Sequence, residues 1–416
     1  MTRPASRAQR PRRASRSRER EGALAAAAAV RVPASCDVVV AGGGAAGLVA
    51  AIAAAEAGAS VTVLERDATC GRPILATGNG RCNFMNEALL GPSPVWDRYN
   101  DPAFVAAVCG ERVGEDVLAF FEGCGLAWAS EEGRLYPLSR QASSVREVLL
   151  ARAGRAGARL APAREVLGAR RGKDGWRVSF RGEAAPDGGE VEAAAVVLAA
   201  GGGSALGREA GLAVTPAEPV LCSLACAPED GGVSLAGLDG RRARAVARLL
   251  RDGAEVARES GEVLFRAYGL SGIVVFDLSR VARAGDVIAL DLLDGLGAPR
   301  AEALVRAAGG TFGLIDPLIA AALGANPLDT ARDLRFIVSG PAEPKRAQVT
   351  RGGLATSQFL PATLEARERP GLFACGEALD VDAACGGYNL AWAWKSGLVA
   401  GRAAAERAGS RPEGPR

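Results

Sequence analysis

The sequence predicts an α/β fold in which a parallel sheet is covered by helices, and three stretches carry that prediction. In residues 37–65 an apolar strand, a glycine-rich turn, an alanine-rich helix and a second apolar strand follow one another. Residues 196–202 form a further apolar run that ends in glycines, and a short apolar strand over 372–375 precedes a long helix. Buried strands that alternate with helices are typical of parallel sheets.

The first turn has glycines at G-x-G-x-x-G spacing. Gly42 permits the tight turn, Gly44 lets a pyrophosphate approach the backbone, and Gly47 lets the helix lie close on the sheet. The N–H groups at the start of that helix favour phosphate. Glu65 ends the second strand, where a carboxylate can accept hydrogen bonds from an adenosine ribose. These features predict an adenine-dinucleotide site; a glycine-rich turn in another kind of α/β protein is the alternative.

The composition of the 416-residue chain excludes several kinds of site. The sequence contains no histidine, which removes the usual general base and any Ser-His-Asp, Cys-His or histidine–metal site. Its nine cysteines are an odd number without a C-x-x-C motif. This pattern indicates free thiols, a reducing cytoplasmic location and no metal site. No apolar run reaches the roughly 18 residues that a membrane-spanning helix needs.

Positive charge is concentrated at the N-terminus. Residues 1–20 contain eight arginines and one glutamate, whereas the whole chain carries only +3, so the remaining residues are slightly acidic and give no indication of nucleic-acid binding. The pair Arg12-Arg13 followed by apolar residues 23–30 is similar to a twin-arginine signal peptide. Because a strand is predicted directly after Cys36, a disordered or mis-started extension on a cytoplasmic protein is favoured.

Residues 71–86 read GRPILATGNGRCNFMN. A run of small and amide residues bounded by arginines does not suit a hydrophobic core, and we expect a loop folded over a polar ligand. Arg72 and Arg81 are available for phosphate, and Asn79 and Asn83 for hydrogen bonds along a ribityl chain.

The pattern G-R/K-x-x-x-x-x-G-x-G-R-C-N in this loop resembles a motif of bacterial NAD(P)/FAD-dependent oxidoreductases. These are grouped as aminoacetone-oxidase-like or 3-dehydro-bile-acid-reductase-like (BaiN-like) flavoproteins. GEVLFRAYGLSGIVVFDLS at 261–279 and GLFACGEALDVDAACGGYNLAWAWKSG at 371–397 are similar to two further family motifs, and residues 347–367 to another. The resemblance covers about residues 36–401.

The resemblance implies a glutathione-reductase-like, FAD-binding Rossmann domain with an inserted β-barrel and a small helical domain. Short alternating strands over 215–280 and short helices over 299–308 and 317–323 favour the same arrangement. The predicted organisation is a disordered Arg/Ala-rich extension (1–35), the first part of the FAD domain (36–212), the barrel and helical insert (213–345), the second part of the FAD domain (346–406) and a disordered tail (407–416).

The expected cofactor contacts come from the glycine turn, the loop after Glu65 and two late strand ends. A helix that starts near residues 386–389 would point its N-terminus at the N1–C2=O edge of the flavin and stabilise the negative charge of the reduced ring. By the resemblance, Gly376 and Glu377 meet the ribityl-pyrophosphate region. The residues expected to bind FAD are Gly42, Gly44, Ala45, Ala46, Gly47, Glu65, Arg66, Arg72, Thr77, Gly78, Asn79, Arg81, Cys82, Asn83, Val166, Gly201, Gly376, Glu377, Gly386, Gly387, Tyr388, Asn389 and Leu390.

The expected function is FAD-dependent hydride transfer through flavin N5, with an unsaturated or carbonyl small molecule as substrate. Residues 196–202 open no second G-x-G-x-x-G unit, so NAD(P)H would bind transiently over the flavin. Tyr388 is the candidate catalytic proton donor, because histidine is absent and this residue begins the helix expected near the ring. A structural tyrosine is the alternative.

Three other functions stay open. An oxidase of the same family would use oxygen to oxidise a small amine or aminoketone. A flavin-binding protein without turnover is suggested by residues 204–207, which are shorter than the loop usual in the family. An RNA-modifying flavoprotein is disfavoured by the acidic body of the chain.

Overall fold

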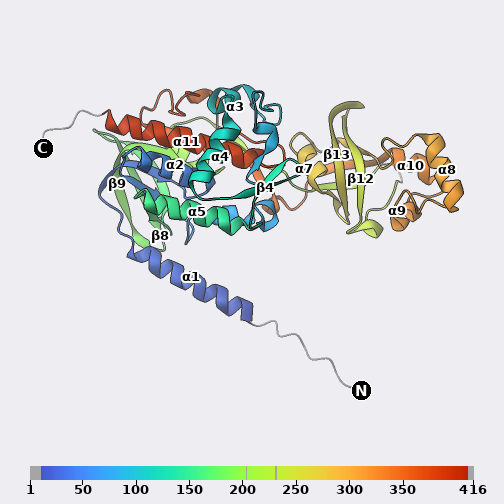
Figure 1. The fold of residues 1–416 in the computed structure, drawn as a ribbon, viewed down its shortest axis with the longest axis horizontal. Helices are drawn as coiled ribbons and strands as arrows, with labels where there is room; N and C mark the ends of the chain where they lie inside the picture. Colours follow the sequence, from blue (N-terminus) through green and yellow to red (C-terminus); the bar gives the residue numbers. More distant parts are fainter. Residues whose placement is uncertain (1–10, 203, 230–231, 411–416) are drawn as a thin grey trace, which may run out of the picture. The chain divides into compact units, whose positions relative to one another are not determined.

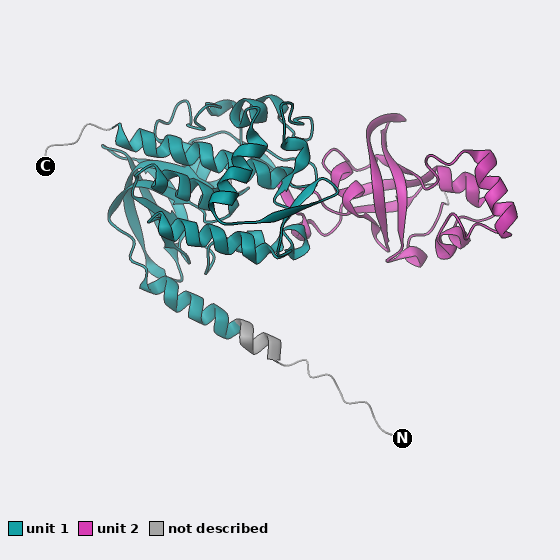
Figure 2. Ribbon diagram, viewed as in Figure 1, with its two compact units in different colours: residues 1–217, 351–416 teal, residues 218–350 magenta. Residues whose placement is uncertain are grey.

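The computed structural model describes residues 11–202, 204–229 and 232–410 (Figure 1). The chain divides into two compact units, residues 1–217 with 351–416 and residues 218–350 (Figure 2). Unit 2 therefore interrupts unit 1 in sequence. It begins and ends five residues later than the insert predicted from the sequence.

The core of unit 1 is a seven-stranded sheet in the order β6-β2-β1-β9-β8-β7, with β18 paired to β9. Strands β6, β2, β1, β9 and β18 run parallel, and β7 and β8 are antiparallel additions. The bounds are β1 (Ser35–Ala41), β2 (Val61–Leu64), β6 (Arg159–Ala161), β7 (Glu165–Arg171), β8 (Trp176–Gly182), β9 (Ala185–Leu198) and β18 (Leu372–Ala374). The carboxyl ends of the parallel strands meet at one edge of the sheet, where ligands bind in such folds.

Two helices pack closely on this sheet because small residues line their contact. Helix α2 (Ala45–Glu56) lies against the long C-terminal helix α11 (Tyr388–Gly409). A Cβ at Gly397 would lie 2.6 Å from the carbonyl oxygen of Ala46, and one at Gly401 would lie 2.3 Å from that of Ala50. Glycine at these two positions therefore lets the backbones of the two helices approach each other.

An aromatic cluster joins α11 to the rest of unit 1. The ring of Phe121 lies 5.1 Å from that of Phe84 and 5.1 Å from that of Trp394. The indole of Trp394 also donates a hydrogen bond to the carbonyl of Phe84 at 2.9 Å. The remaining elements are α3 (Pro102–Cys109), α4 (Val113–Gly123), α5 (Ala142–Arg155), α6 (Ser204–Glu209), the 3-10 helices η1 (Arg72–Gly80), η2 (Glu87–Leu89), η5 (Thr356–Gln358) and η6 (Gly376–Ala378), and the small sheet of β3 (Met85–Asn86), β5 (Arg134–Pro137) and β4 (Trp128–Glu131).

Unit 2 contains the predicted barrel, which closes in the order β11-β14-β13-β12-β15-β16. Phe265 and Phe336 fill its interior, with ring centroids 6.3 Å apart. The barrel strands are β11 (Leu224–Pro228), β12 (Arg242–Arg251), β13 (Ala254–Arg266), β14 (Gly269–Ser271), β15 (Val287–Asp291) and β16 (Leu334–Pro341). Its helices are α7 (Ile273–Ser279), α8 (Ala298–Ala308), α9 (Pro317–Ala322) and α10 (Pro327–Arg332), with η3 (Ala236–Leu238) and η4 (Pro344–Arg346). Strands β10 (Val214–Val220) and β17 (Val349–Leu354) pair with each other where the chain leaves and re-enters unit 1.

The two ends of the chain differ from the expectation. The extension predicted to be disordered contains a helix, α1 (Pro11–Ala29), and Arg164 donates a hydrogen bond to the carbonyl of Ala27 at 3.1 Å. Helix α11 continues to Gly409, three residues into the predicted tail. Residues 1–10 and 411–416 lie outside the described residues. Among the described helices, none is both long and apolar enough to cross a membrane.

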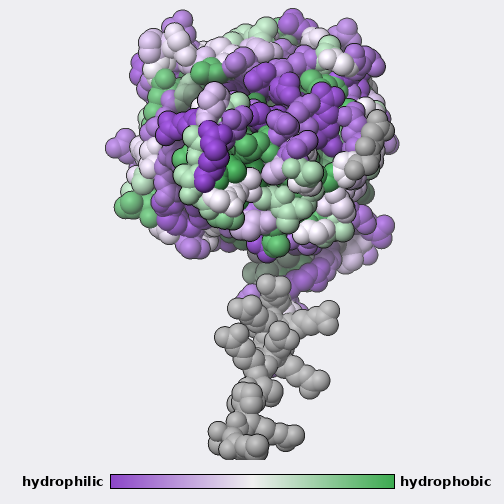
Figure 3. Space-filling view, turned by 90° about the vertical axis from the view of Figure 1, so that its right-hand side faces the viewer, coloured by the Kyte–Doolittle hydropathy of each residue, from purple (hydrophilic) through white to green (hydrophobic). Residues whose placement is uncertain are grey.

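Large apolar side chains are exposed in the helical part of unit 2. Leu304 is 42% exposed, Leu318 is 49% exposed, and Phe312 is 63% exposed. Figure 3 shows apolar surface, in green, bordered by hydrophilic residues on the face that it presents.

Candidate functional site

The turn between β1 and α2 has the geometry that a bound pyrophosphate needs. Gly42 has a φ of +108°, and a Cβ there would lie 2.5 Å from the carbonyl oxygen of Ala199. A Cβ at Gly47 would lie 1.9 Å from the carbonyl oxygen of Gly42. Beside Gly44, by contrast, the described chain leaves open space within 4 Å, and no described side chain caps α2. The first backbone N–H groups of α2, including those of Ala45 and Ala46, are therefore accessible to a ligand from the side of Gly44.

Glu65 ends β2 within hydrogen-bonding distance of this turn. Its carboxylate accepts from the backbone N–H of Gly43 at 2.6 Å and from that of Asp67 at 2.7 Å. The side chain is buried, and burial raises the pKa of Glu65 above its usual value. Arg66, the next residue, is exposed. The carboxylate therefore holds the glycine turn in place, and its binding of an adenosine ribose stays a prediction.

The loop after Glu65 closes on itself through residues with positive φ. Gly78 and Asn79 have φ values of +54° and +55°, and Cys82 has a φ of +56°. The N–H of Cys82 donates to the carbonyl of Thr77 at 3.0 Å, and the buried Sγ of Cys82 has its pKa raised to about 11. Burial also raises the pKa of Cys70 to about 12. Burial therefore favours the neutral form of both thiols, and both cysteines are free.

Both arginines predicted to contact phosphate have protein partners. Arg72 forms an ion pair with Asp67 at 3.0 Å. Arg81 lies 3.7 Å from the carboxylate of Glu131, and its guanidinium stacks 4.9 Å from the ring of Tyr136. Binding of phosphate by either arginine therefore stays a prediction.

The ends of β9 and β18 bring Gly201, Gly376 and Glu377 to the same edge of the sheet. A Cβ at Gly376, whose φ is +62°, would lie 2.6 Å from the Cβ of Ala46 in α2. A Cβ at Gly201 would lie 3.9 Å from Oε2 of Glu377. Burial raises the pKa of Glu377 to about 7. Gly376 thus lies next to the first turn of α2, and the partly buried carboxyl group of Glu377 lies near Gly201. Their contact with the ribityl-pyrophosphate region stays a prediction.

The N-terminus of α11 is the second uncapped helix start at the site. Gly386 and Gly387 precede it with φ values of +122° and +100°, and no side chain in the described structure caps it. Asn86 donates from Nδ2 to the carbonyl of Gly386 at 2.9 Å. A Cβ at Gly387 would lie 2.8 Å from Oδ1 of Asn83. That Oδ1 atom is buried and has no hydrogen-bond donor among the described residues.

The first residues of α11 have structural partners. Tyr388 is 7% exposed, and the hydroxyl of Tyr99 donates to its backbone carbonyl at 3.0 Å. The side-chain amide of Asn389 accepts from the N–H of Ala383 at 2.9 Å and donates to its carbonyl at 2.8 Å. Leu390 is partly buried and packs against the core. The Asn389 amide thus braces the preceding loop, and the catalytic assignment of Tyr388 stays a prediction.

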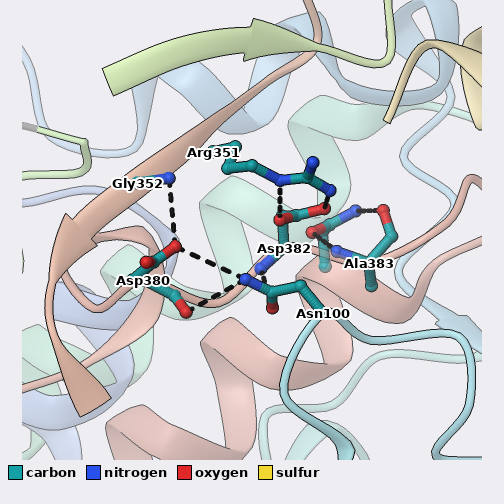
Figure 4. Close-up of polar contacts among 7 residues, drawn as sticks. Asn100, Arg351, Gly352, Asp380, Asp382 and Ala383 are labelled. Atoms are coloured by element: carbon teal, nitrogen blue, oxygen red, sulfur yellow. Dashed lines mark hydrogen bonds and ion pairs between the residues drawn. The ribbon is translucent and has the colours of Figure 1, made fainter. Parts of the chain in front are cut away.

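Sequence reasoning missed the polar cluster that holds this loop (Figure 4). Arg351 donates to both carboxylate oxygens of Asp382, at 2.8 and 3.1 Å, and Asp382 is fully buried. Asn100 accepts from the N–H of Asp382 at 2.9 Å and donates to the carbonyl of Asp380 at 3.2 Å. The N–H of Gly352 donates to Oδ1 of Asp380 at 3.1 Å. The two aspartates of D-V-D, shortly before the paired glycines, were the only sequence signal for this cluster. Their hydrogen-bond partners could not be predicted, because they lie far away in the sequence.

Val166 is placed differently from the other predicted contacts. It lies in β7 and is buried, and it pairs with Phe180 of the neighbouring strand β8. The nearby N–H of Arg164 donates to the carbonyl of Glu65 at 2.7 Å, which brings this segment beside the predicted ribose position. The assignment of Val166 to the adenosine end of the cofactor site stays a prediction.

The residues present fit FAD. Two uncapped helix N-termini suit the pyrophosphate and the flavin edge, and the open approach at Gly44 gives access to the first of them. The unpaired Oδ1 of Asn83 requires a donor that the described chain does not supply. Within the described ranges, no three His, Cys, Asp or Glu residues gather in a group that could hold a metal ion.

Comparison with known proteins identifies the family of the chain. The model of the HI0933-like protein Rossmann domain matches residues 36–403. A 3-dehydro-bile acid delta(4,6)-reductase of Clostridium scindens is 32% identical over 420 residues, covering 88% of this chain and 98% of that protein. Ribosomal RNA dihydrouridine synthases of Escherichia coli and Haemophilus influenzae are 26% and 25% identical, each over 86% of this chain and 96% of their own length.

Solved structures with a similar chain path include two oxidoreductases. A flavocytochrome c3 fumarate reductase in its open conformation matches with a TM-score of 0.49 at 16% identity, over 94% of this chain and 81% of that one. A 3-ketosteroid-delta4-(5alpha)-dehydrogenase from Rhodococcus jostii RHA1 matches with a TM-score of 0.48 at 17% identity, over 92% of this chain and 98% of that one. The family model that matches residues 36–403 and the 32% identity to the bile acid reductase establish the family of this chain. The chain belongs to the HI0933-like family of flavoprotein oxidoreductases.

Proposed function

We propose that the protein is an FAD-dependent reductase that uses NAD(P)H to saturate a carbon–carbon double bond conjugated to a carbonyl group. The names of the relatives point to one chemistry. A delta(4,6)-reductase of a 3-dehydro-bile acid saturates bonds conjugated to a ketone, and dihydrouridine forms when the double bond of uracil next to its carbonyl is saturated. The identity to the first relative, over nearly its whole length, supports a small organic substrate.

The observation that carries this proposal is the uncapped N-terminus of α11 beside Gly386 and Gly387. When FAD is bound, it supplies hydride transfer through N5. The N–H groups at this helix start would stabilise negative charge on the reduced ring, because the positive end of the helix dipole lies there. The first turn of α2 would hold the pyrophosphate and Glu65 the ribose.

A proton must also reach the substrate, and the chain has no histidine to deliver it. Tyr388 is our proposed donor, because it is the first residue of α11. Its neighbour Tyr99 is a poor candidate, since its hydroxyl donates to the carbonyl of Tyr388 and burial raises its pKa well above the usual value.

An anaerobic titration of the purified protein with NADH and NADPH tests this proposal. We expect an FAD absorbance band that bleaches near one equivalent of one of the two nucleotides, and reoxidation by an enone substrate. Bleaching by amines or aminoketones alone, followed by rapid reoxidation with oxygen, would favour the oxidase. A bound flavin that no donor reduces would favour a flavin-binding protein without turnover.

A second candidate function is the reduction of uracil in ribosomal RNA. Two relatives carry that name, and helix α1 presents Arg18 and Arg20 on an exposed surface. The candidate is weaker because the identity is lower and because Arg20 is paired with Glu183. Dihydrouridine formed in ribosomal RNA by the reduced enzyme would establish it, whereas turnover of a steroid enone with no change in RNA would exclude it.

A further inference from the structure

Asn83 has a buried acceptor atom without a donor. Its Oδ1 is one of three buried side-chain atoms in the described chain that lack a hydrogen-bond partner. Leaving such an atom unpaired is costly, so a partner is expected in the functional state. The atom lies at the start of α11, 2.8 Å from the point that a Cβ of Gly387 would occupy.

The buried acceptor of Asn83 lies close to the backbone N–H donors at the start of α11. Gly387 is the N-cap of α11, so the backbone N–H groups of Asn389 and Leu390 lie in the first turn, where a helix offers them no carbonyl. A carbonyl oxygen, Oδ1 of Asn83, therefore lies beside a group of backbone N–H donors. A ligand that matches both must present an acceptor and a donor next to each other.

The pyrimidine edge of a flavin has this arrangement. Its C2=O accepts hydrogen bonds, and the adjacent N3–H donates one. Gly387 has a φ of +100°, and a Cβ there would lie 2.7 Å from the carbonyl oxygen of Met85 and 2.8 Å from Oδ1 of Asn83, so only glycine lets these two oxygens lie so close to the N-cap. A ribityl hydroxyl could also donate, but it does not pair a fixed donor with a fixed acceptor.

We propose that Oδ1 of Asn83 accepts the hydrogen bond of flavin N3–H while the first turn of α11 donates to C2=O. Asn83 thereby sets the orientation of the ring at this helix start, instead of contacting the ribityl chain as the sequence suggests. The inference rests on the proposed FAD binding, and it names the atom of the cofactor that this side chain recognises.

A cofactor analogue without the donor provides the test. The protein is stripped of FAD and reconstituted with FAD or with 3-methyl-FAD, in which N3 carries a methyl group, and each dissociation constant is measured by fluorescence. For the wild type we expect 3-methyl-FAD to bind at least about tenfold more weakly, the loss typical of an unpaired buried acceptor. For Asn83→Ala we expect FAD to bind about tenfold more weakly and the preference over 3-methyl-FAD to fall below about threefold.

Two further measurements separate this role from a structural one. Asn83→Asp keeps an acceptor but adds negative charge, so the midpoint potential of the bound flavin should become more negative. Asn326→Ala serves as the control. Asn326 is the N-cap residue of α10, and its side chain makes no capping hydrogen bond, so this substitution should change neither the preference for FAD over 3-methyl-FAD nor the midpoint potential.

The outcomes distinguish this inference from the proposed function. An unchanged FAD preference in Asn83→Ala would overturn the N3 contact while FAD binding stands. If Asn83→Ala instead no longer distinguishes FAD from an analogue that lacks a ribityl hydroxyl, Asn83 binds the ribityl chain. A wild-type protein that binds neither FAD nor its analogue would overturn the proposed function itself.

Discussion

The guanidinium of Arg351 donates two hydrogen bonds, at 2.8 and 3.1 Å, to the fully buried carboxylate of Asp382. The pair joins β17, where the chain re-enters unit 1, to the loop that precedes α11. Asn100 braces the same loop through the backbone of Asp382. The position of Gly386 and Gly387 therefore depends on residues from three distant parts of the sequence.

Arg351→Met should be strongly destabilising. It leaves the carboxylate of Asp382 buried without its cation, which typically costs about 3–5 kcal/mol. We expect the free energy of unfolding in urea to fall by about 3 kcal/mol and bound FAD to be released at lower urea than the wild type requires. Arg242→Met, which breaks an exposed pair with Glu262, serves as the control and should cost at most about 1 kcal/mol. Equal effects of the two substitutions would show that the buried pair has no special role.

Gly44→Ala should separate cofactor binding from folding. The backbone of Gly44 has an ordinary extended conformation, and the described chain leaves its Cβ position open, so alanine fits the protein itself. Its methyl group would occupy the approach that we assign to the pyrophosphate. We expect an unfolding free energy within about 0.5 kcal/mol of the wild type and FAD affinity reduced at least about tenfold. Gly154→Ala, within α5, should stabilise the protein by about 0.5–1 kcal/mol and leave FAD affinity unchanged. Normal FAD affinity in Gly44→Ala would place the pyrophosphate elsewhere.

Glu377 should make the stability of the FAD-free protein depend on pH. Burial raises its pKa from the ordinary 4.5 to about 7, so the folded state binds this proton more tightly than the unfolded state. The proton on Glu377 therefore contributes about 3 kcal/mol to the free energy of unfolding below pH 4.5. This contribution is lost as the pH rises to about 7, and the folded state becomes less stable by that amount. Glu377→Gln should remove this part of the pH dependence in urea unfolding measured between pH 5 and 8. Glu209→Gln, on the exposed end of α6, should leave it intact. A wild-type profile retained in Glu377→Gln would contradict the assignment.

The parts of the fold that were predicted correctly depend on local sequence. The turn from Gly42 to Gly47 could be predicted because a side chain at Gly42 or Gly47 would clash with nearby backbone atoms. The barrel could be predicted from the alternating pattern of its strands. Helix α1 was missed because its arginines suggested disorder, although its run of alanines has the highest intrinsic helix propensity.

The parts of the site that were missed depend on tertiary contacts. Nothing near Arg351 in the sequence indicates that its partner is Asp382, and nothing near Arg81 indicates that it stacks on Tyr136. Neither partner could be inferred from spacing, because only the folded chain brings these residues together.

Tyr388→Phe tests the proposed proton donor. Tyr99 bonds to the backbone carbonyl of Tyr388, and this contact survives when the side chain of Tyr388 changes, so FAD binding should be maintained. The reduction of bound flavin by NAD(P)H requires no proton from the protein and should keep its rate. Reoxidation by an enone should slow by about 10²- to 10⁴-fold, because the substrate carbon must be protonated in that half-reaction. Rapid-mixing absorbance measures the two half-reactions separately. Tyr99→Phe serves as the control and should leave the ratio of the two rates unchanged, since its hydroxyl is committed to the helix start. If Tyr388→Phe slows both half-reactions equally, the tyrosine is structural and the proton comes from solvent.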